Sequence, residues 1–205
     1  MLKRPIAVVF DIGNVLYDWD PRVLYRRLID DDGALDVFLR DVCSREWHFQ
    51  HDAGRPFAET SAELCARFPD QAHLIAQWGP RFSEQIPGPI EGMPELVAEL
   101  DSAGVPLFAI TNFSDEFFTP FREQEAAMFG HFRDIVLSGA EKLVKPDAAI
   151  YRLALERFAL APHEALFVDD RQDNVDGAKA VGMHAVPFTD VVTLREDLER
   201  FGLLE

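Results

Sequence analysis

Short, continuous runs of apolar residues recur along the chain and are separated by stretches of mixed polarity. Five runs stand out, at residues 6–10 (IAVVF), 105–110 (VPLFAI), 135–137 (IVL), 165–168 (ALFV) and 184–188 (HAVPF). Their apolar positions are consecutive rather than alternating, which is typical of strands that are covered by helices on both faces. The pattern therefore predicts five buried strands of a parallel sheet.

Helical patterns separate the later strands. They occur at residues 92–104 (GMPELVAELDSAG), 146–160 (PDAAIYRLALERFAL) and 174–183 (NVDGAKAVGM). Pro94 lies near the start of the first helix, and Gly104 and Gly182 lie near the ends of the first and the third, as helix boundaries favour. This alternation of strands and helices predicts an α/β fold with a doubly wound parallel sheet, a Rossmann-like core.

The last residues of the chain, 189–205, have the period of an amphipathic helix. Its apolar positions are expected to face the core: Val192, Leu194, Leu198 and Phe201. The same stripe would also fit a contact between two copies of the chain, so a monomer and a homodimer both stay open.

The long segment between the first and second strands has no strand signal. Four helices are expected there, near residues 21–30, 34–43, 56–68 and 70–85. A connection of this length usually forms a unit of its own. We therefore expect a helical cap at residues 17–88, called the cap segment below, inserted into a catalytic core that is formed by residues 1–16 and 89–205.

Charge and cysteine content narrow the function classes. The chain has 36 acidic and 20 basic residues, for a net charge of −16, so it repels a phosphate backbone and nucleic acid is not an expected partner. Cys43 and Cys65 are too few for a disulfide framework. The first apolar run is too short for a signal peptide, and no later segment is long enough to span a bilayer. We expect a cytoplasmic protein with no membrane partner.

Polar side chains follow three of the predicted strands, where the strands end. They are Asp11, Thr111 with Asn112, and Asp169 with Asp170. Lys145 stands just before Pro146, where the next helix is expected to begin. In open parallel sheets, ligands bind beyond the carboxyl ends of the strands. These side chains are therefore expected to converge at one edge of the sheet.

The converging residues are of the types that bind a metal ion and a phosphate group. The carboxylates of Asp11 and Asp170 offer oxygen ligands for a hard cation such as Mg²⁺. Lys145 and the Thr111 hydroxyl would neutralise and orient the other oxygens of a phosphate group. Asp11 would then attack phosphorus and form an aspartyl-phosphate. Each residue alone is ordinary at a strand end or on a surface, and only the set in this order supports the prediction.

Four segments resemble the four signature motifs of the haloacid dehalogenase superfamily. They are FDIGNV, AITNFS, KPDAAIY and FVDDRQDNVDGA, and the resemblance spans residues 6–188. The helical insertion after the first motif is similar to that of the helical-cap subgroup. Within this subgroup, DIGNVLYDWD and EWHFQHDAGR most resemble the α-D-glucose-1-phosphate phosphatase-like branch. The resemblance implies a Mg²⁺-dependent phosphomonoester hydrolase for a small phosphorylated metabolite, with a sugar phosphate favoured.

The resemblance also implies roles for single residues. Asp11 matches the nucleophile and first metal ligand, and Asp170 matches the acidic metal ligand of the last motif. Thr111 matches the hydroxyl that binds the phosphoryl group, with Asn112 beside it as a further phosphate contact. Lys145 matches the lysine that balances the charge of nucleophile and phosphate.

Gly13 departs from the pattern of the superfamily. Most of its phosphatases have a second Asp there, whose backbone carbonyl binds the metal and whose side chain protonates the leaving group. Gly13 keeps the carbonyl but loses the general acid–base, which is typically worth about 10²–10⁴-fold in rate. Good leaving groups, as in sugar 1-phosphates or acyl phosphates, would need less protonation. Otherwise a cap residue, Asp18 or Asp20 would supply the proton.

Two other functions stay open. The 2-haloacid dehalogenases of this superfamily also lack that Asp, but Asp169 and Asp170 would repel a carboxylate substrate in a metal-free site. A catalytically weak binding or scaffold protein on the same fold is the third possibility, and the retained Lys145 counts against it.

The densest polar and aromatic cluster of the cap segment is REWHFQHDAGR, residues 45–55. Candidates for substrate specificity in this cluster are Trp47, His48, His51, Asp52 and Arg55, of which Arg55 suits an anionic group. The competing interpretation is that Trp47 and Phe49 pack the cap helices while the others face solvent. The spacing of His48 and His51 permits a metal site, but such pairs are usually only neighbours.

Overall fold

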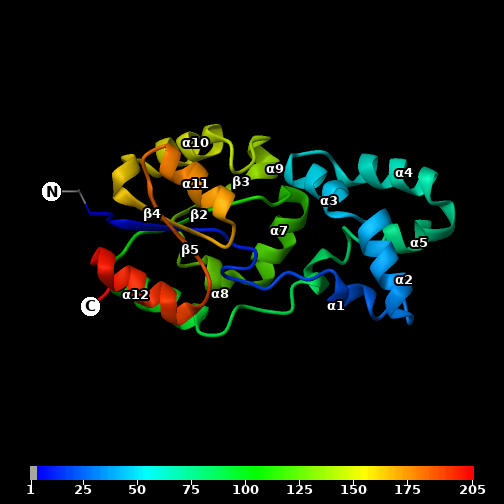
Figure 1. The fold of residues 1–205 in the computed structure, drawn as a ribbon, viewed down its shortest axis with the longest axis horizontal. Coiled ribbons are helices and arrows are strands. Elements are labelled where there is room, and N and C mark those ends of the chain that lie inside the picture. The colour runs from blue at the N-terminus through cyan, green and yellow to red at the C-terminus, as the bar shows by residue number, and fades with distance from the viewer. Residues whose placement is uncertain (1–3) are drawn as a thin grey trace.

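The computed structural model describes residues 4–205, and its centre is a five-stranded sheet (Figure 1). The strands are β1 (Ala7–Phe10), β2 (Leu107–Thr111), β3 (Asp134–Leu137), β4 (Ala165–Asp169) and β5 (His184–Pro187). All neighbouring pairs are parallel, in the order β3-β2-β1-β4-β5. The five predicted strands are confirmed, each to within about two residues at either end.

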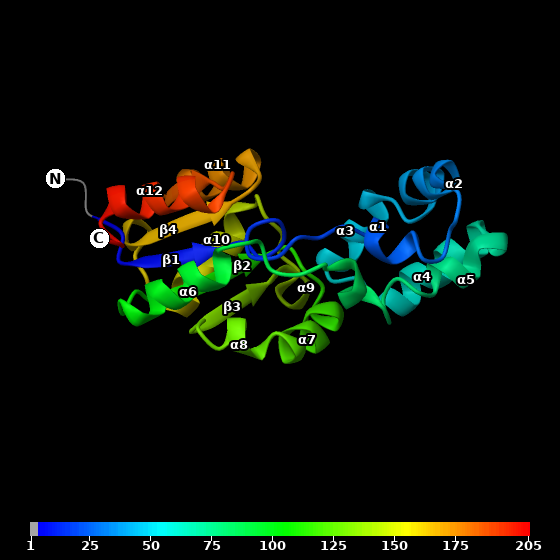
Figure 2. The same ribbon diagram turned by 90° about the horizontal axis from the view of Figure 1, so that it is seen from below.

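The helices of the cap segment lie together beyond the carboxyl ends of the strands (Figure 2). They are α1 (Arg22–Tyr25), α2 (Asp32–Val37) with a π-helical turn (Phe38–Val42), α3 (Arg45–Asp52), α4 (Phe57–Arg67) and α5 (Ala72–Ile75), with 3₁₀ turns at Pro69–Gln71 and Phe82–Gln85. Tyr17 and Pro89 pair in an isolated β-bridge where the chain leaves and re-enters the core. That pairing fits a boundary at 17–88, which stays a prediction.

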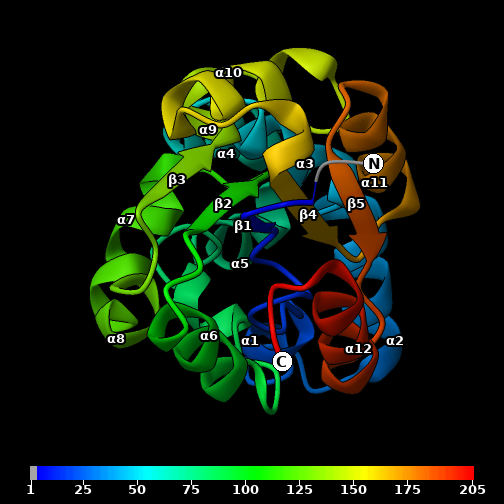
Figure 3. The same ribbon diagram turned by 90° about the vertical axis from the view of Figure 1, so that its left-hand side faces the viewer.

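Helices cover both faces of the sheet, as the continuous apolar runs predict (Figure 3). The helices α6 (Met93–Ser102) and α12 (Val191–Phe201) pack on one face, against Val8 and Phe10 of β1. The helices α10 (Ala148–Phe158) and α11 (Gln172–Ala180) pack on the other face, against Ala7 and Val9. The doubly wound α/β fold is confirmed.

Several helices have no counterpart among the predicted elements. On the core they are α7 (Asp115–Gln124), α8 (Ala126–Phe129), α9 (Ser138–Glu141) and the 3₁₀ turn Pro162–Glu164. In the cap segment α3 was not predicted, and the helix expected near 70–85 is broken into short turns. The buried face of α7 is aromatic, from Phe117, Phe118 and Phe121, so its pattern is short and carries no aliphatic repeat.

The inward orientation predicted for Val192 is wrong, because this side chain is 70% exposed. Leu194 and Leu198 are buried as predicted, four residues apart on one face of α12. Asp190 caps the helix by accepting a hydrogen bond from the Thr193 N–H, so the helix begins at Val191. Val191, three residues before Leu194, therefore lies on the buried face, and Val192 lies off it.

Candidate active site

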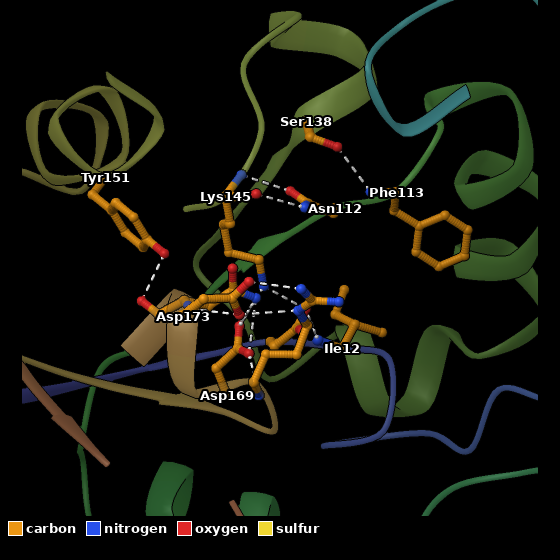
Figure 4. A network of polar contacts seen from close by, with 11 residues as sticks. Ile12, Asn112, Phe113, Ser138, Lys145, Tyr151, Asp169 and Asp173 are labelled. Carbon is orange, nitrogen blue, oxygen red and sulfur yellow. Dashed lines mark hydrogen bonds and ion pairs between the residues drawn. The ribbon is translucent and has the colours of Figure 1, made fainter. Parts of the chain in front are cut away.

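A buried lysine joins two of the strand ends (Figure 4). Lys145 Nζ lies 2.9 Å from Oδ1 of Asp11, directly after β1, and 2.7 Å from Oδ2 of Asp169, the last residue of β4. Thr111, the last residue of β2, is buried beside them and lines the same cavity. These side chains lie together at the carboxyl edge of the sheet, where the sequence predicts them.

Asp169 is fully buried and has many partners. Its carboxylate accepts hydrogen bonds from Asn174 Nδ2, at 2.9 and 3.1 Å, and from the Arg171 N–H at 2.9 Å, besides its contact with Lys145. Both of its oxygens are therefore occupied. Asp169 holds the lysine in place, and the neighbouring Asp170, which is exposed, is left to face the cavity.

Asn112 fixes the backbone of Lys145. The Lys145 N–H donates to Asn112 Oδ1 at 2.8 Å, and Asn112 Nδ2 donates to the Lys145 carbonyl at 3.1 Å. This reciprocal pair joins residues that are far apart in the chain and aligns the loop that carries the lysine. A phosphate contact by Asn112 stays a prediction, since the described partners already use both ends of its amide.

The electrostatics of the site are dominated by burial and by an excess of acids. Burial raises the pKa of Asp11 to about 7; Lys145 acts against this rise and Asp169 adds to it. Burial alone would lower the pKa of Lys145, but Asp11 and Asp169 outweigh it and the pKa is raised. Lys145 is therefore a permanent cation, and an additional cation would be needed to keep Asp11 fully ionised at neutral pH.

The acids of this edge fit a divalent cation. Carboxylate oxygens of Asp11, Asp169 and Asp170 lie within 4.8 Å of one another. Burial and the charge of Asp169 raise the pKa of Asp170, and a hydrogen bond from the Asn14 side chain opposes that rise. Three acids thus face one lysine, and oxygen donors of this kind suit Mg²⁺. Because Asp169 is already saturated, Asp11, Asp170 and the Gly13 carbonyl are the candidate ligands.

A cavity of about 700 Å³ opens above these residues, between the core and the cap segment. This volume is in the usual range for a small-molecule site. Aromatic and aliphatic side chains form much of its wall: Tyr17, Trp19, Phe49, Phe82, Ile86, Phe113 and Phe121. The strand ends therefore bring charged groups to the cavity, and much of the remaining lining is aromatic or aliphatic.

Of the predicted specificity residues, His48 and Asp52 reach the cavity. The His48 ring stacks against Trp19 and against Phe82, with ring centroids 4.8 and 5.6 Å away. Burial lowers the pKa of His48 to about 3, so its ring is neutral. This histidine is a rigid part of the wall.

The other three candidates have partners elsewhere. Trp47 Nε1 donates to the Thr60 carbonyl at 3.2 Å, and His51 Nε2 lies 2.6 Å from Thr60 Oγ1, so both rings are fixed within the cap segment. Arg55 pairs with Glu63 at 2.7 Å. None of Trp47, His51 and Arg55 belongs to the described wall of the cavity.

The helix α3 explains this division. Residues 45, 48, 49 and 52 follow the spacing i, i+3, i+4 and i+7 and line the cavity, whereas Trp47 and His51 lie on another face. Recognising a helix over 45–52 would have separated the two sets from sequence alone. Ser44 gave a signal for it, since its side chain accepts a hydrogen bond from the Trp47 N–H and caps the helix.

Comparison with known proteins places the chain in a family. A family model for haloacid dehalogenase-like hydrolases matches residues 7–182, so the chain belongs to this family and is a hydrolase. The finer placement in the α-D-glucose-1-phosphate phosphatase-like branch stays a prediction.

Relatives of the chain include phosphatases. It is 28% identical over 190 residues to a sesquiterpene phosphatase of Aspergillus oryzae, with 90% of each chain covered. It is 24% identical over 187 residues to a phosphorylated carbohydrates phosphatase of Thermotoga maritima, with 88% of this chain and 83% of the relative covered. A Bacteroides thetaiotaomicron enzyme of the family, solved with magnesium and inorganic phosphate, superposes with a TM-score of 0.70 at 17% identity and covers 91% of this chain and 95% of its own, so the two share a fold.

Proposed function

We propose that the protein is a Mg²⁺-dependent phosphomonoester hydrolase that acts on a small phosphorylated metabolite through an aspartyl-phosphate on Asp11. One observation carries the proposal: a buried lysine sits between Asp11 and Asp169, beside the exposed Asp170, at the carboxyl edge of the sheet. A nucleophilic carboxylate approaches a phosphate dianion only where positive charge offsets the repulsion between them.

Each residue of the site has a proposed task. Lys145 holds Oδ1 of Asp11, which also accepts the Ile12 N–H, so Oδ2 has no protein partner among the described residues and is the oxygen that attacks phosphorus. The Thr111 hydroxyl donates to a phosphate oxygen. Mg²⁺, when bound by Asp11, Asp170 and the Gly13 carbonyl, would neutralise the other phosphate oxygens. Water then cleaves the aspartyl-phosphate and releases phosphate.

Two substrate classes are supported, by different observations. The sequence favours a sugar phosphate, and the phosphorylated carbohydrates phosphatase is a relative of matching length. The aromatic wall of the cavity favours an apolar carbon skeleton, and the sesquiterpene phosphatase is a relative that is covered over nearly its whole length. We therefore place both a sugar phosphate and an isoprenoid phosphate in the proposed range.

The two alternative functions have less support. A 2-haloacid dehalogenase would bring a carboxylate substrate to an edge where three acids already face one lysine. A scaffold protein has no need for a lysine buried between two carboxylates, since burying charges is costly.

The location and assembly of the protein remain proposals. We propose a cytoplasmic location, which the two unpaired cysteines Cys43 and Cys65 support. Within residues 4–205, no helix combines the length and the apolar character that a membrane span requires. The expected partner is the phosphorylated small molecule itself, and the protein acts as a monomer or a homodimer.

Phosphate release from a substrate panel tests this function. The panel holds sugar 1- and 6-phosphates, acetyl phosphate, farnesyl phosphate and p-nitrophenyl phosphate, each assayed with Mg²⁺, with EDTA and with Asp11→Asn. Metal-dependent release that Asp11→Asn abolishes supports the proposal. Release of halide from 2-chloropropionate without metal would favour the dehalogenase, and no turnover on any compound would favour the scaffold protein.

A further inference from the structure

A carboxyl group from the cap segment lines the same cavity as Asp11. Asp52 is the last residue of α3, and its side chain lines the cavity that also contains Asp11, Gly13 and Lys145. Gly13 has no side chain to donate a proton, so another carboxyl group of the cavity would have to replace it.

The end of α3 is docked firmly on the core. The Asp52 carbonyl accepts a hydrogen bond of 2.6 Å from Ser138 Oγ. The same hydroxyl oxygen accepts the Phe113 N–H at 2.9 Å, as Figure 4 shows. Two residues further on, Gly54 has a φ of 86°, and a Cβ there would lie 2.6 Å from the Gly139 carbonyl oxygen. This close approach requires glycine and sets the position of Asp52 relative to α9, the helix after β3.

The carboxyl group of Asp52 is buried and incompletely paired. Its side chain is 9% exposed, and Oδ1 has no hydrogen-bond partner. Oδ2 lies 3.7 Å from Nε2 of the neutral His48, beyond hydrogen-bond distance. A deeply buried acid with one unpaired oxygen is costly as a carboxylate but much less so as a neutral carboxyl.

Burial outweighs the polar and charged groups around Asp52. Burial raises the pKa of Asp52 well above its usual value, and the charge of Asp11 adds to the rise. The Ser114 N–H and the more distant Lys145 oppose it without cancelling it. The raised pKa of Asp52 therefore favours its neutral form, which has an O–H group to donate.

Two other acids of the cavity wall are poor proton donors. Asp18 and Glu46 both line the cavity, but both are exposed to solvent. The pKa of Glu46 is lowered by its own backbone N–H and by Ser44, which favours the charged form. Asp52 is thus the buried acid that the proposed reaction leaves without a task among the described residues of the wall.

We propose that Asp52 is the general acid–base of this site and takes the place of the side chain missing at Gly13; this inference rests on the proposed function. As Asp11 attacks phosphorus and the bond from phosphorus to the leaving oxygen breaks, Asp52 donates its proton to that oxygen and an alcohol departs. The Asp52 carboxylate then accepts a proton from water while the water oxygen attacks the aspartyl-phosphate. The phosphorus–Asp11 bond breaks, phosphate leaves, and Asp52 is protonated again.

The first test compares two leaving groups in Asp52→Asn. Hexyl phosphate releases a strongly basic alkoxide that needs a proton, whereas p-nitrophenyl phosphate releases an anion that does not. We expect kcat for hexyl phosphate to fall about 10²–10⁴-fold and kcat for p-nitrophenyl phosphate to fall less than about tenfold. Equal losses on both esters, or a wild type that hydrolyses only the aryl ester, would overturn the inference.

Matched variants separate Asp52 from the other acids of the wall. Asp18→Asn and Glu46→Gln are each expected to change kcat for the two esters by the same factor. If either one instead removes hexyl phosphate hydrolysis selectively, that residue is the proton donor and Asp52 is not. In the metal-free protein at pH 7, the infrared difference between wild type and Asp52→Asn is expected to contain the carbonyl band of a protonated carboxyl; a carboxylate band would contradict the inference.

A rescue variant gives the sharpest test. No atom lies within 4 Å of a Cβ built at Gly13, and its φ is outside the left-handed region, so a side chain fits there. Gly13→Asp added to Asp52→Asn is expected to restore hexyl phosphate hydrolysis at least tenfold, and no restoration counts against the inference. Failure of the proposed function has a different signature, which is p-nitrophenyl phosphate turnover that is absent or insensitive to Asp11→Asn. That result would overturn both the proposed function and the inference about Asp52.

Discussion

The ammonium group of Lys145 lies 2.7 Å from Oδ2 of Asp169, and neither side chain is exposed to solvent. This pair fixes the position of the lysine in the site, where the same ammonium group also contacts Asp11. Asn112 fixes the lysine backbone and Asn174 fixes the aspartate, so both partners are held from two directions.

Removing the lysine is expected to destabilise the whole fold. Lys145→Met leaves the buried Asp169 without its cation, and breaking a buried pair in this way costs about 3–5 kcal/mol. The urea midpoint of unfolding measures the loss. Lys179→Met, which removes an exposed lysine of α11, is the control and is expected to change the midpoint little. A similar midpoint for the two variants would contradict the structural role of Lys145.

Binding of Mg²⁺ is expected to stabilise the protein in the absence of substrate. At a concentration one hundred times its dissociation constant, the ion would add about 2.7 kcal/mol to the free energy of unfolding. Asp170→Asn is expected to remove most of this gain, as followed by thermal unfolding with and without Mg²⁺. Asp173→Asn is the matched control, because Asp173 is an exposed acid that pairs with Arg171. An equal gain in both variants would exclude Asp170 as a ligand.

The stability of the fold is expected to depend on pH through His48. Its pKa is about 3 in the folded protein, lowered by burial, against 6.5 for an ordinary histidine. Between these values the unfolded chain binds a proton that the folded chain does not, so the contribution of His48 is present above pH 6.5 and is lost as pH falls. As pH falls below 6.5, the free energy of unfolding of His48→Phe is expected to rise relative to that of wild type by about 1.4 kcal/mol per pH unit.

Urea unfolding at pH 6.5 and pH 5 measures this difference. Comparison with wild type isolates His48 from Asp11 and Asp52, whose raised pKa values act in the opposite direction. His73→Gln, at an exposed position, is the control. The prediction is wrong if the His48→Phe and wild-type stabilities change in parallel over this range.

The packing of α12 is testable with two substitutions. Leu198 is fully buried, and Leu198→Ala is expected to cost about 2–5 kcal/mol in the free energy of unfolding. Val192 is largely exposed, and Val192→Ala is expected to stay within about 0.5 kcal/mol of wild type. Denaturant unfolding measures the free energy of unfolding of both variants. Comparable decreases in the two would mean that Val192 is buried after all.

The strands and the residues after them were predictable because their signals are local. A continuous apolar run such as IAVVF predicts a buried strand by itself, and the carboxyl ends of parallel strands must share one edge. The positions of Asp11, Thr111 and Asp170 at that edge therefore follow from sequence. Their catalytic roles are still proposals.

Contacts between distant segments were beyond prediction from sequence. The amide of Asn112 bonds to the backbone of Lys145, 33 residues away, and no sequence pattern indicates that pairing. The choice between Asp169 and Asp170 for the lysine depends on which side chain points into the core at the end of β4. Val192 is an error of another kind, because the spacing of Leu194 and Leu198 already places Val191 rather than Val192 on the buried face of a helix.

The hydroxyl of Ser138 has a consequence for how substrate enters. It accepts the Phe113 N–H, a bond within the core, and donates to the Asp52 carbonyl, a bond to the cap segment. If α3 lifts away, only the second bond breaks, and the loop after β2 keeps its shape. In such an opened form the proposed phosphate-binding residues would stay in place and the proposed proton donor would return only on closure, so that admission of the substrate and cleavage of its ester would be separate events in time.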